Sequence, residues 1–355
     1  MRELALLIFI SAFLVSLPKL LLAQEVQETE LALYQGFYFQ PAKVLDEAEL
    51  EYSTLSLVRG REGSVLISFM VDTAGKPFEV RTLSATGDGP VERSAIRALN
   101  ASTFSPAQLN GQAVDSLHHR HIYTFEIEGG FRASQSFADE YRPFHAAIEE
   151  GDIEDARSFL RKMERLDSLE TKIYEQGLYL YSASRLANLE ADAYKHLTLT
   201  NHLVAFGRHR PDILSESKLY EVLVNAFRLQ AQAGYYAEAA ENFQRIKQHL
   251  LVSQLDLAQL QPIYDQLVSI KGDDGAYSVE AEIDDESRWY ISLYKSEFYI
   301  DRAEGRLEEI KLLCEASYQN FDYQEGATYT LSENWGECVL EVTGRRGSTF
   351  YLTQQ

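Results

Sequence analysis

The sequence predicts a multidomain protein: a small α+β module, then an all-α helical-repeat module, then a C-terminal all-β module with one disulfide. Two observations support this order. Short runs of β-forming residues with turn signals occupy residues 63–127 and return after residue 275. The segment between them has helical spacing and a recurring motif. A chain of 355 residues is also long enough for two or three domains.

The composition limits the possible classes of function. Lys and Arg together number 33 against 54 Asp and Glu residues, which gives a formal net charge of -21. Such a chain repels phosphate backbones at long range, and no basic run offsets this, so nucleic acid is excluded as a partner. The hydrophobic fraction of 45% is enough to build packed cores.

The first 23 residues have the composition of an export signal. Arg2 gives a positive start, residues 4–17 are apolar, and the small residue Ala23 offers a cleavage site. We expect residues 1–23 to be a signal peptide that is cleaved after Ala23, which places the mature protein in the periplasm.

An uncleaved inner-membrane anchor that faces the periplasm is the alternative for this segment. Residues 4–23 are about as long as a helix that spans a bilayer. Pro18 and Lys19 interrupt the apolar run and favour cleavage.

The α+β module is expected within residues 53–130, after an acidic and polar lead-in segment over residues 24–52. β-forming residues at 64–71 and 76–83 flank a turn and predict a hairpin. Apolar residues at helical spacing follow the hairpin, and β-forming residues at 121–127 predict a last strand. The order strand, strand, helix, strand defines a small α+β unit.

At about residues 60–128 this pattern resembles the TonB C-terminal domain. The marks of that family are a glycine-closed hairpin, a helix, an aromatic-x-Pro-Ala step and a following Asn-Gly turn. In this sequence the four marks are, in the same order, Gly63–Gly75, Pro90 with Ala95–Leu99, Phe104-Ser105-Pro106-Ala107 and Asn110–Val114. The strand residues Tyr123-Thr124-Phe125 complete the resemblance.

The resemblance implies a binding function. Domains of this family bind periplasmic segments of outer-membrane transporters by adding a partner strand to an open sheet edge, where main-chain hydrogen bonds give affinity. Carried over to this chain, the edge is the last strand, with Ile122, Tyr123, Thr124, Phe125, Glu126 and Ile127.

Three departures from the family pattern favour a binding module without a motor connection. Family transducers usually end with this domain, but here more than 200 residues follow it. They also have a long Pro-rich spacer, whereas here Pro41 is the only proline between the expected signal peptide and Gly63. The membrane anchor of family transducers typically carries a His, and residues 4–23 contain none. The alternative is a membrane-anchored, atypical TonB energy transducer. An inner-membrane proton-channel complex is a partner only in that case, with the N-terminus uncleaved.

Residues 135–270 are expected to be helical and repetitive. A turn former followed five positions later by Ala occurs at Gly151–Ala156, Asn188–Ala193 and Gly234–Ala239. The stretch resembles tetratricopeptide-like helical hairpins, in which Phe159, Tyr194 and Phe243 are expected to fill the space between repeats. A generic helical bundle is the alternative. Either architecture implies a scaffold or a concave peptide-binding surface.

Residues 275–355 contain many short β-like runs with turns between them, which predict a small β-sandwich or barrel. The chain has two cysteines, Cys314 and Cys338. In an exported protein they predict a disulfide, which would contribute about 3 kcal/mol through the unfolded state. Two free buried thiols are the alternative.

We found no residue pattern that indicates catalysis, a cofactor or a metal site. His118-His119-Arg120-His121 is the most metal-like cluster, but on a strand at most two of its His side chains share a face, and a site needs three or four ligands. Nucleophile elbows, phosphate loops and dinucleotide fingerprints are absent from the sequence. We therefore expect no enzyme activity.

The sequence as a whole predicts a periplasmic binding or adaptor protein of the cell envelope. We expect its partners to be envelope proteins, among them outer-membrane transporters, bound by strand addition. A secreted glycan-binding protein, with Trp289 and Trp335 as stacking platforms in the last module, is a second alternative.

Overall fold

The computed structural model describes residues 32–34, 37–51, 54, 58–86, 89–126, 133–166, 169 and 172–355. The predicted signal peptide, residues 1–23, lies outside the described residues. In the part of the chain that is described, no helix combines the length and the hydropathy needed to cross a bilayer.

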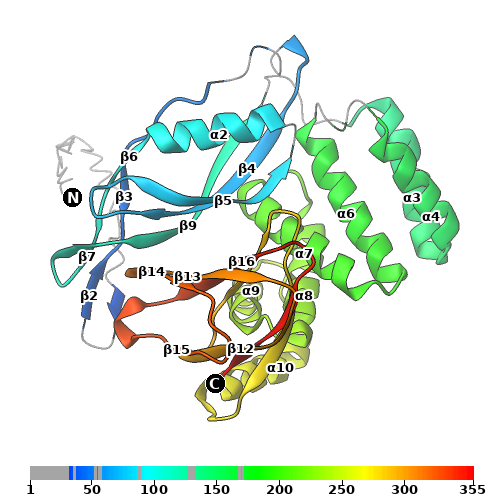
Figure 1. Ribbon diagram of the computed structural model, residues 1–355. Helices are drawn as coiled ribbons and strands as arrows, with labels where there is room; N and C mark the ends of the chain where they lie inside the picture. The colour runs from blue at the N-terminus through cyan, green and yellow to red at the C-terminus, as the bar shows by residue number, and fades with distance from the viewer. Residues whose placement is uncertain are drawn as a thin grey trace, which may run out of the picture. The chain divides into compact units, whose positions relative to one another are not determined.

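The first module is a three-stranded antiparallel sheet covered on one face by a helix (Figure 1). Its elements are β4 (Gly63–Val71), β5 (Pro77–Thr86), α2 (Gly89–Ala101) and β9 (Ser116–Phe125), and the sheet order is β5-β4-β9. The apolar face of α2 packs on the sheet because its buried residues recur at helical spacing. These residues are Val91, Ala95, Ala98 and Leu99. For this sheet and its helix the predicted order strand, strand, helix, strand is confirmed, but three short strands that were not predicted lie between α2 and β9.

The lead-in segment adds short strands beside this module. β2 and β3 pair with strands that follow α2 in the chain, so the lead-in segment is part of the fold. The two small sheets are β1 (Ala32–Tyr34), β2 (Phe37–Gln40), β7 (Ala107–Leu109) and β8 (Gln112–Val114), and separately β3 (Lys43–Asp46) with β6 (Thr103–Ser105).

Gly75 closes the β4–β5 hairpin at a position where no side chain fits. Its φ is 78°, and a Cβ there would lie 2.0 Å from the carbonyl oxygen of Phe104. The Phe104 N–H donates a hydrogen bond to the Gly75 carbonyl at 3.1 Å. The hairpin turn is therefore joined directly to β6, the start of the aromatic-x-Pro-Ala step.

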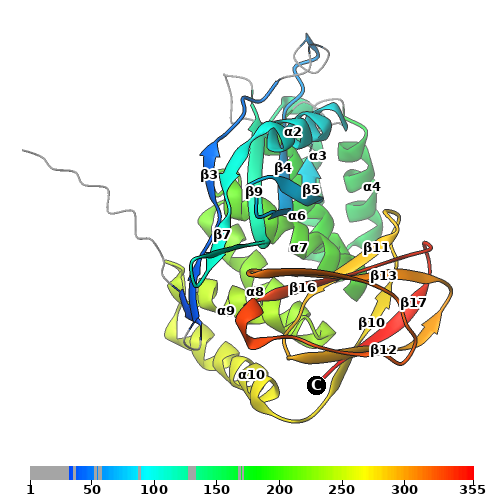
Figure 2. The ribbon, with the colours of Figure 1, turned by 60° about the vertical axis from the view of Figure 1, so that its left-hand side comes forward.

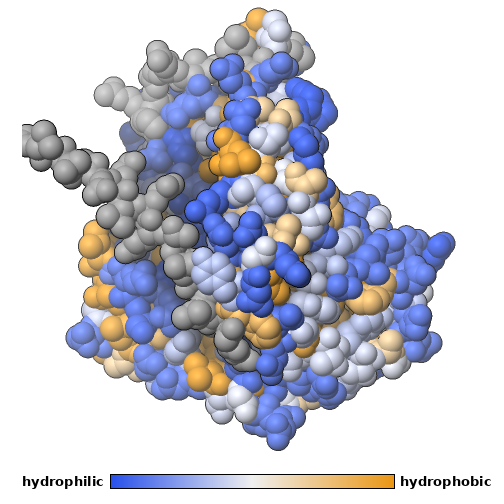
Figure 3. Space-filling view, turned by 90° about the vertical axis from the view of Figure 1, so that its left-hand side faces the viewer, coloured by the Kyte–Doolittle hydropathy of each residue, from blue (hydrophilic) through white to orange (hydrophobic). Residues whose placement is uncertain are grey.

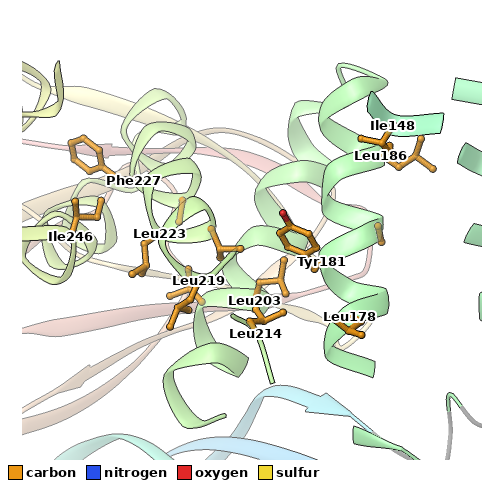
Figure 4. Packing of buried hydrophobic residues seen from close by; sticks show 14 of the residues in the cluster. Ile148, Leu178, Tyr181, Leu186, Leu203, Leu214, Leu219, Leu223, Phe227 and Ile246 are labelled. Carbon is orange, nitrogen blue, oxygen red and sulfur yellow. The ribbon is translucent and has the colours of Figure 1, made fainter. Parts of the chain in front are cut away.

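The middle of the chain forms helices that pair as antiparallel neighbours, α3 with α4, α6 with α7, and α8 with α9. They are α3 (Gln135–Glu150), α4 (Ile153–Glu164), α6 (Ile173–Leu189), α7 (Ala193–His209), α8 (Glu216–Ala233), α9 (Tyr236–Gln248) and α10 (Gln254–Gly272). Figure 4 shows the buried side chains of this region, among them Tyr181, Leu203 and Phe227, in one continuous cluster. The tetratricopeptide assignment itself stays a prediction.

Each copy of the recurring motif lies at the turn of one helix pair, but the second copy is displaced relative to the others. Asp152 caps α4 and Asp192 caps α7 in the same way, each carboxylate accepting from the N–H three residues later. Ala156 and His196 each follow their cap by four residues and are therefore equivalent positions, and both are buried. Tyr194 is 80% exposed, so its predicted role as a filler between repeats is wrong.

The last module consists of two four-stranded antiparallel sheets that enclose a common apolar core (Figure 2). Their orders are β10-β17-β12-β15 and β11-β16-β13-β14. The strands are β10 (Tyr277–Glu282), β11 (Arg288–Ser292), β12 (Glu297–Glu304), β13 (Leu307–Cys314), β14 (Ser317–Asp322), β15 (Thr328–Thr330), β16 (Cys338–Gly344) and β17 (Thr349–Gln354).

The predicted disulfide is confirmed. Cys314 on β13 and Cys338 on β16 lie directly opposite each other in the sheet and are bonded. Both are buried in the core of the last module. Trp289 and Trp335 pack against the same core, and the Trp289 ring meets Phe350 edge-on at 5.3 Å, which leaves the glycan-platform alternative without structural support.

Candidate partner-binding edge

β9 is the outer strand of its sheet. Within the described residues the only strand paired with it is β4, in antiparallel register with Leu66 opposite Ile122 and Ser64 opposite Thr124. Of the six predicted edge residues, four lie in β9, and Glu126 follows the strand directly. Ile127 lies outside the described residues.

The side chains of β9 alternate between two packed environments. Tyr123 and Phe125 are each 2% exposed and belong to the core beneath α2. Ile122 and Thr124 point to the opposite face, because successive residues of a strand alternate, and are partly buried. Since the buried side chains are already committed to packing, the backbone of the strand is the part best placed to recognise a partner.

The β4–β9 pair is fastened to the helices at one end. The Ile173 N–H, at the start of α6, donates to the Glu62 carboxylate at 3.2 Å, directly before β4. At the end of β9, Arg210 lies 3.7 Å from the carboxylate of Glu126 and binds Asp212 at 2.8 Å. The hydrogen bond from Arg210 holds the pKa of Asp212 below its ordinary value. The β4–β9 pair is therefore connected to the start of α6 and to the residue that follows α7.

His121 is the only one of the four clustered residues whose side chain the structure describes. Its Nε2 lies 2.9 Å from the carboxylate of Glu47, which belongs to the lead-in segment. Among the described residues no group of three or more His, Cys, Asp or Glu side chains is arranged to hold a metal ion. The side chains of residues 118–120 lie outside the description.

The face of the sheet opposite α2 is covered by the last module, a contact that we call the junction. All nine residues of β4 are buried, which requires cover on both faces. On the first-module side the junction contains Met70, Phe78 and Leu117, and on the last-module side Leu313, Tyr318 and Val339. Residues 32–355 accordingly form one compact unit.

A buried ion pair crosses the junction. The guanidinium of Arg81 on β5 lies 3.3 Å from the carboxylate of Glu341 on β16, and each side chain is 3% exposed. Lys311 and Arg288 approach the same carboxylate at 3.8 and 4.0 Å. Three cations therefore lie within 4.0 Å of one buried carboxylate, and two of them have a closer acidic partner, Lys311 with Glu79 and Arg288 with Glu286.

Glu79 makes the second polar contact of the junction. It sits at an irregularity in β5 with a φ of 45°, an unusual value for a residue other than Gly. Its carboxylate accepts hydrogen bonds from Lys311 at 2.9 Å and from the Tyr318 hydroxyl at 2.7 Å. Burial acts to raise the pKa of Glu79, but these two hydrogen bonds outweigh it and hold the pKa below its ordinary value.

The junction was not predicted from the sequence. One signal was present: Glu341 is a single charged residue inside the apolar strand Cys338–Gly344. A charge in such a strand needs a buried partner, but nothing in the sequence identifies Arg81 as that partner.

The geometry defines an α+β module with one helix on a three-stranded antiparallel sheet and its last strand at the edge. Residues 48–127 match the family model described as the Gram-negative bacterial TonB protein C-terminal. The predicted resemblance of this region to the TonB C-terminal domain is thereby confirmed.

The curated relatives agree with the family match. The chain is 32% identical over 91 residues to "Protein TonB" of Vibrio cholerae serotype O1, which covers 25% of this chain and 36% of that protein. It is 32% identical over 65 residues to "Protein tonB2" of Pseudomonas aeruginosa, and the match covers 18% of this chain and 24% of that protein. The chain thus spans about a third or less of the relatives it matches.

A solved structure is also similar to this region. It is the solution NMR structure of the Pseudomonas aeruginosa TonB CTD, with 21% sequence identity over 25% of this chain and 90% of that chain, at a TM-score of 0.23.

Proposed function

We propose that this chain is a periplasmic binding or adaptor protein that serves outer-membrane transport. Its TonB C-terminal domain would bind a transporter segment as an added strand along β9. The observation that carries the proposal is the position of β9 at the sheet edge, with its side chains packed and its backbone on the outer side. The family match of residues 48–127 supports the class of partner.

The proposed role is non-catalytic and needs no cofactor. Binding by strand addition uses main-chain hydrogen bonds, so the protein contributes a preformed strand edge and no reactive group. The fastening of β4 and β9 to the helices through Glu62 and Arg210 supports this role, because a preformed edge loses less entropy when it binds.

The test is site-specific crosslinking in the cell envelope. A photoreactive amino acid at Ile122 or Thr124 is expected to capture an outer-membrane transporter. The matched control is Thr82, a residue of the same type on β5, the opposite outer strand of the sheet, where no capture is expected. Hydrogen exchange with a synthetic transporter segment should in parallel slow the amides of β9. Equal capture at Thr82 and Thr124, or no change in exchange, would remove strand addition from the proposal.

The match to two TonB proteins also favours a second candidate, a membrane-anchored energy transducer. Mass spectrometry of the mature N-terminus separates the two. A chain that begins at Gln24 supports the soluble adaptor. An intact Met1 end, recovered with inner-membrane proton-channel proteins, supports the transducer.

A further inference from the structure

A polar pocket lies among the helices, away from the β9 edge. It has a volume of about 340 Å³ and opens between α3, α6 and α8. A smaller pocket of about 110 Å³ shares Tyr181, Arg185 and Glu221 with it. The face of the molecule in Figure 3 is mostly hydrophilic, with small separate hydrophobic patches. α3 and α6 lie at the right of Figure 1, on the other side of the molecule from that face, and the pocket combines aromatic rings with charged groups from three helices.

His145 on α3 lines this pocket and carries a hydrogen-bond donor that has no partner among the described residues. The Nη1 atom of Arg185 lies 3.1 Å from His145 Nδ1. A guanidinium can only donate, so Nδ1 accepts and the proton of the neutral ring is on Nε2. Burial, with the charges of Arg185 and Lys218, lowers the pKa of His145 to about 4, so the ring is neutral at neutral pH. Nε2 is buried and has no hydrogen-bond partner among the described residues.

Tyr141, which also lines the pocket, carries a second donor next to His145. Its ring lies 4.4 Å from that of His145, edge to face. Its hydroxyl is also buried without a hydrogen-bond partner in the described part of the chain. Burial raises the pKa of Tyr141 to about 12, so the hydroxyl keeps its proton.

The remaining groups favour an anionic acceptor. Two buried donors without partners cost free energy that an acceptor would recover. Arg185 and Lys218 bring positive charge to the pocket, and the Glu221 carboxylate already accepts from the Tyr181 hydroxyl at 2.7 Å. The second carboxylate, that of Glu149, is on an exposed residue.

We infer that this pocket binds a carboxylate group, which accepts hydrogen bonds from Tyr141 and His145 and is balanced by Arg185 and Lys218. The carboxylate can come from a small organic acid or from the C-terminus of a peptide. The inference does not depend on the proposed function of β9, because it uses other residues in other elements.

The test uses the full mature chain with ¹³C-labelled histidine. The probes are acetate, N-acetyl-trialanine with a free C-terminal carboxylate, and the same peptide as its amide. We expect a saturable shift of the His145 ring resonance with a carboxylate probe and at least tenfold weaker binding of the amide. Tyr141→Phe and Arg185→Gln are each expected to weaken binding about tenfold.

Tyr179→Phe is the matched control, because Tyr179 is on α6 and does not line the pocket. Tyr141→Phe should unfold at the same urea concentration as the wild type or higher, since it removes a hydroxyl that has no partner. A peptide that binds more tightly than acetate indicates a peptide end, and equal binding indicates a small acid. An absent shift, equal binding of acid and amide, or unchanged affinity in Tyr141→Phe would overturn the inference.

Discussion

Arg81 and Glu341 form the ion pair with the least contact with solvent at the junction. Removing two charges from water is costly, and the cost is recovered only when each charge meets its partners in good geometry. Glu341 has Arg81, Lys311 and Arg288 within 4.0 Å, but among the described residues its Oε2 and the Arg81 Nη1 make no hydrogen bond, so the pair is held by charge alone. The pair is therefore sensitive to the loss of one partner, because the other would remain buried and uncompensated.

We predict that Glu341→Gln lowers the free energy of unfolding by about 3 kcal/mol, since it leaves Arg81 buried without a counter-charge. Urea unfolding measures this difference. The double substitution Arg81→Met with Glu341→Met should recover much of the loss. Asp285→Asn is the matched control, because Asp285 and Arg346 form a pair that is 77% and 71% exposed, and we expect a change below about 0.5 kcal/mol. Similar losses in the two single variants would show that the junction pair is not buried in solution.

At the scale of elements, the β4–β5 hairpin depends on its turn as much as on its strands. The turn presses against the backbone of Phe104, so it fixes where β6 begins. Gly111, in the turn between β7 and β8, has a similar φ of +81° but open space around it. The two glycines therefore separate the effect of close packing from that of backbone conformation.

Gly75→Ala is expected to destabilise the protein by more than 3 kcal/mol, because the new methyl group overlaps a backbone oxygen and the turn must move. Gly111→Ala should cost only about 1 kcal/mol, through its positive φ alone. Thermal unfolding of both variants measures the contrast. If the two variants lose equal stability, the contact between the turn and β6 is not formed in solution.

Elements with a strong local pattern were predictable from the sequence. The hairpin, α2 and β9 follow from periodicity and turn residues, and the disulfide follows from two cysteines in a chain whose first residues have the composition of an export signal. The second copy of the helical motif was placed in the wrong register because Ala193 was aligned where His196 packs. The cap formed by Asp192 sets that register, and a match of small residues alone cannot locate it.

At the scale of the whole molecule, the junction joins the first and last modules through residues far apart in the chain. Lys311 and Tyr318 both bind Glu79. Such contacts could not be predicted from the sequence. The alternation of apolar and polar residues in a strand shows which face of a sheet is buried, but it does not show which other element covers that face. The pocket between α3, α6 and α8 was missed for the same reason, since its residues come together only when three helices pack.

The junction is expected to weaken in acid. The pKa of Glu79 is below its ordinary value of 4.5 in the folded protein, so its stabilising contribution is complete above pH 4.5. The contribution is lost as the pH falls from there through the lower folded pKa. Glu79→Gln should therefore be less stable than the wild type at pH 7, by about 1 kcal/mol or more. Urea unfolding between pH 7 and pH 3 should show this difference shrinking below pH 4.5, and a constant difference would contradict the role of the carboxylate.

The place of β17 in its sheet has a consequence for the order of folding. β10 and β12 precede it in the chain, yet both pair with β17, which lies between them. The helices need only local contacts and can form early, whereas this sheet must wait for a strand that arrives much later. Met70, Phe78 and Leu117 are covered by Leu313, Tyr318 and Val339 of the other sheet. That sheet shares one core with the sheet of β17, so the covering module is complete only when β17 is inserted. A newly made chain would thus expose an apolar, aggregation-prone surface before β17 is inserted, and a chaperone that shields this surface would act before that step.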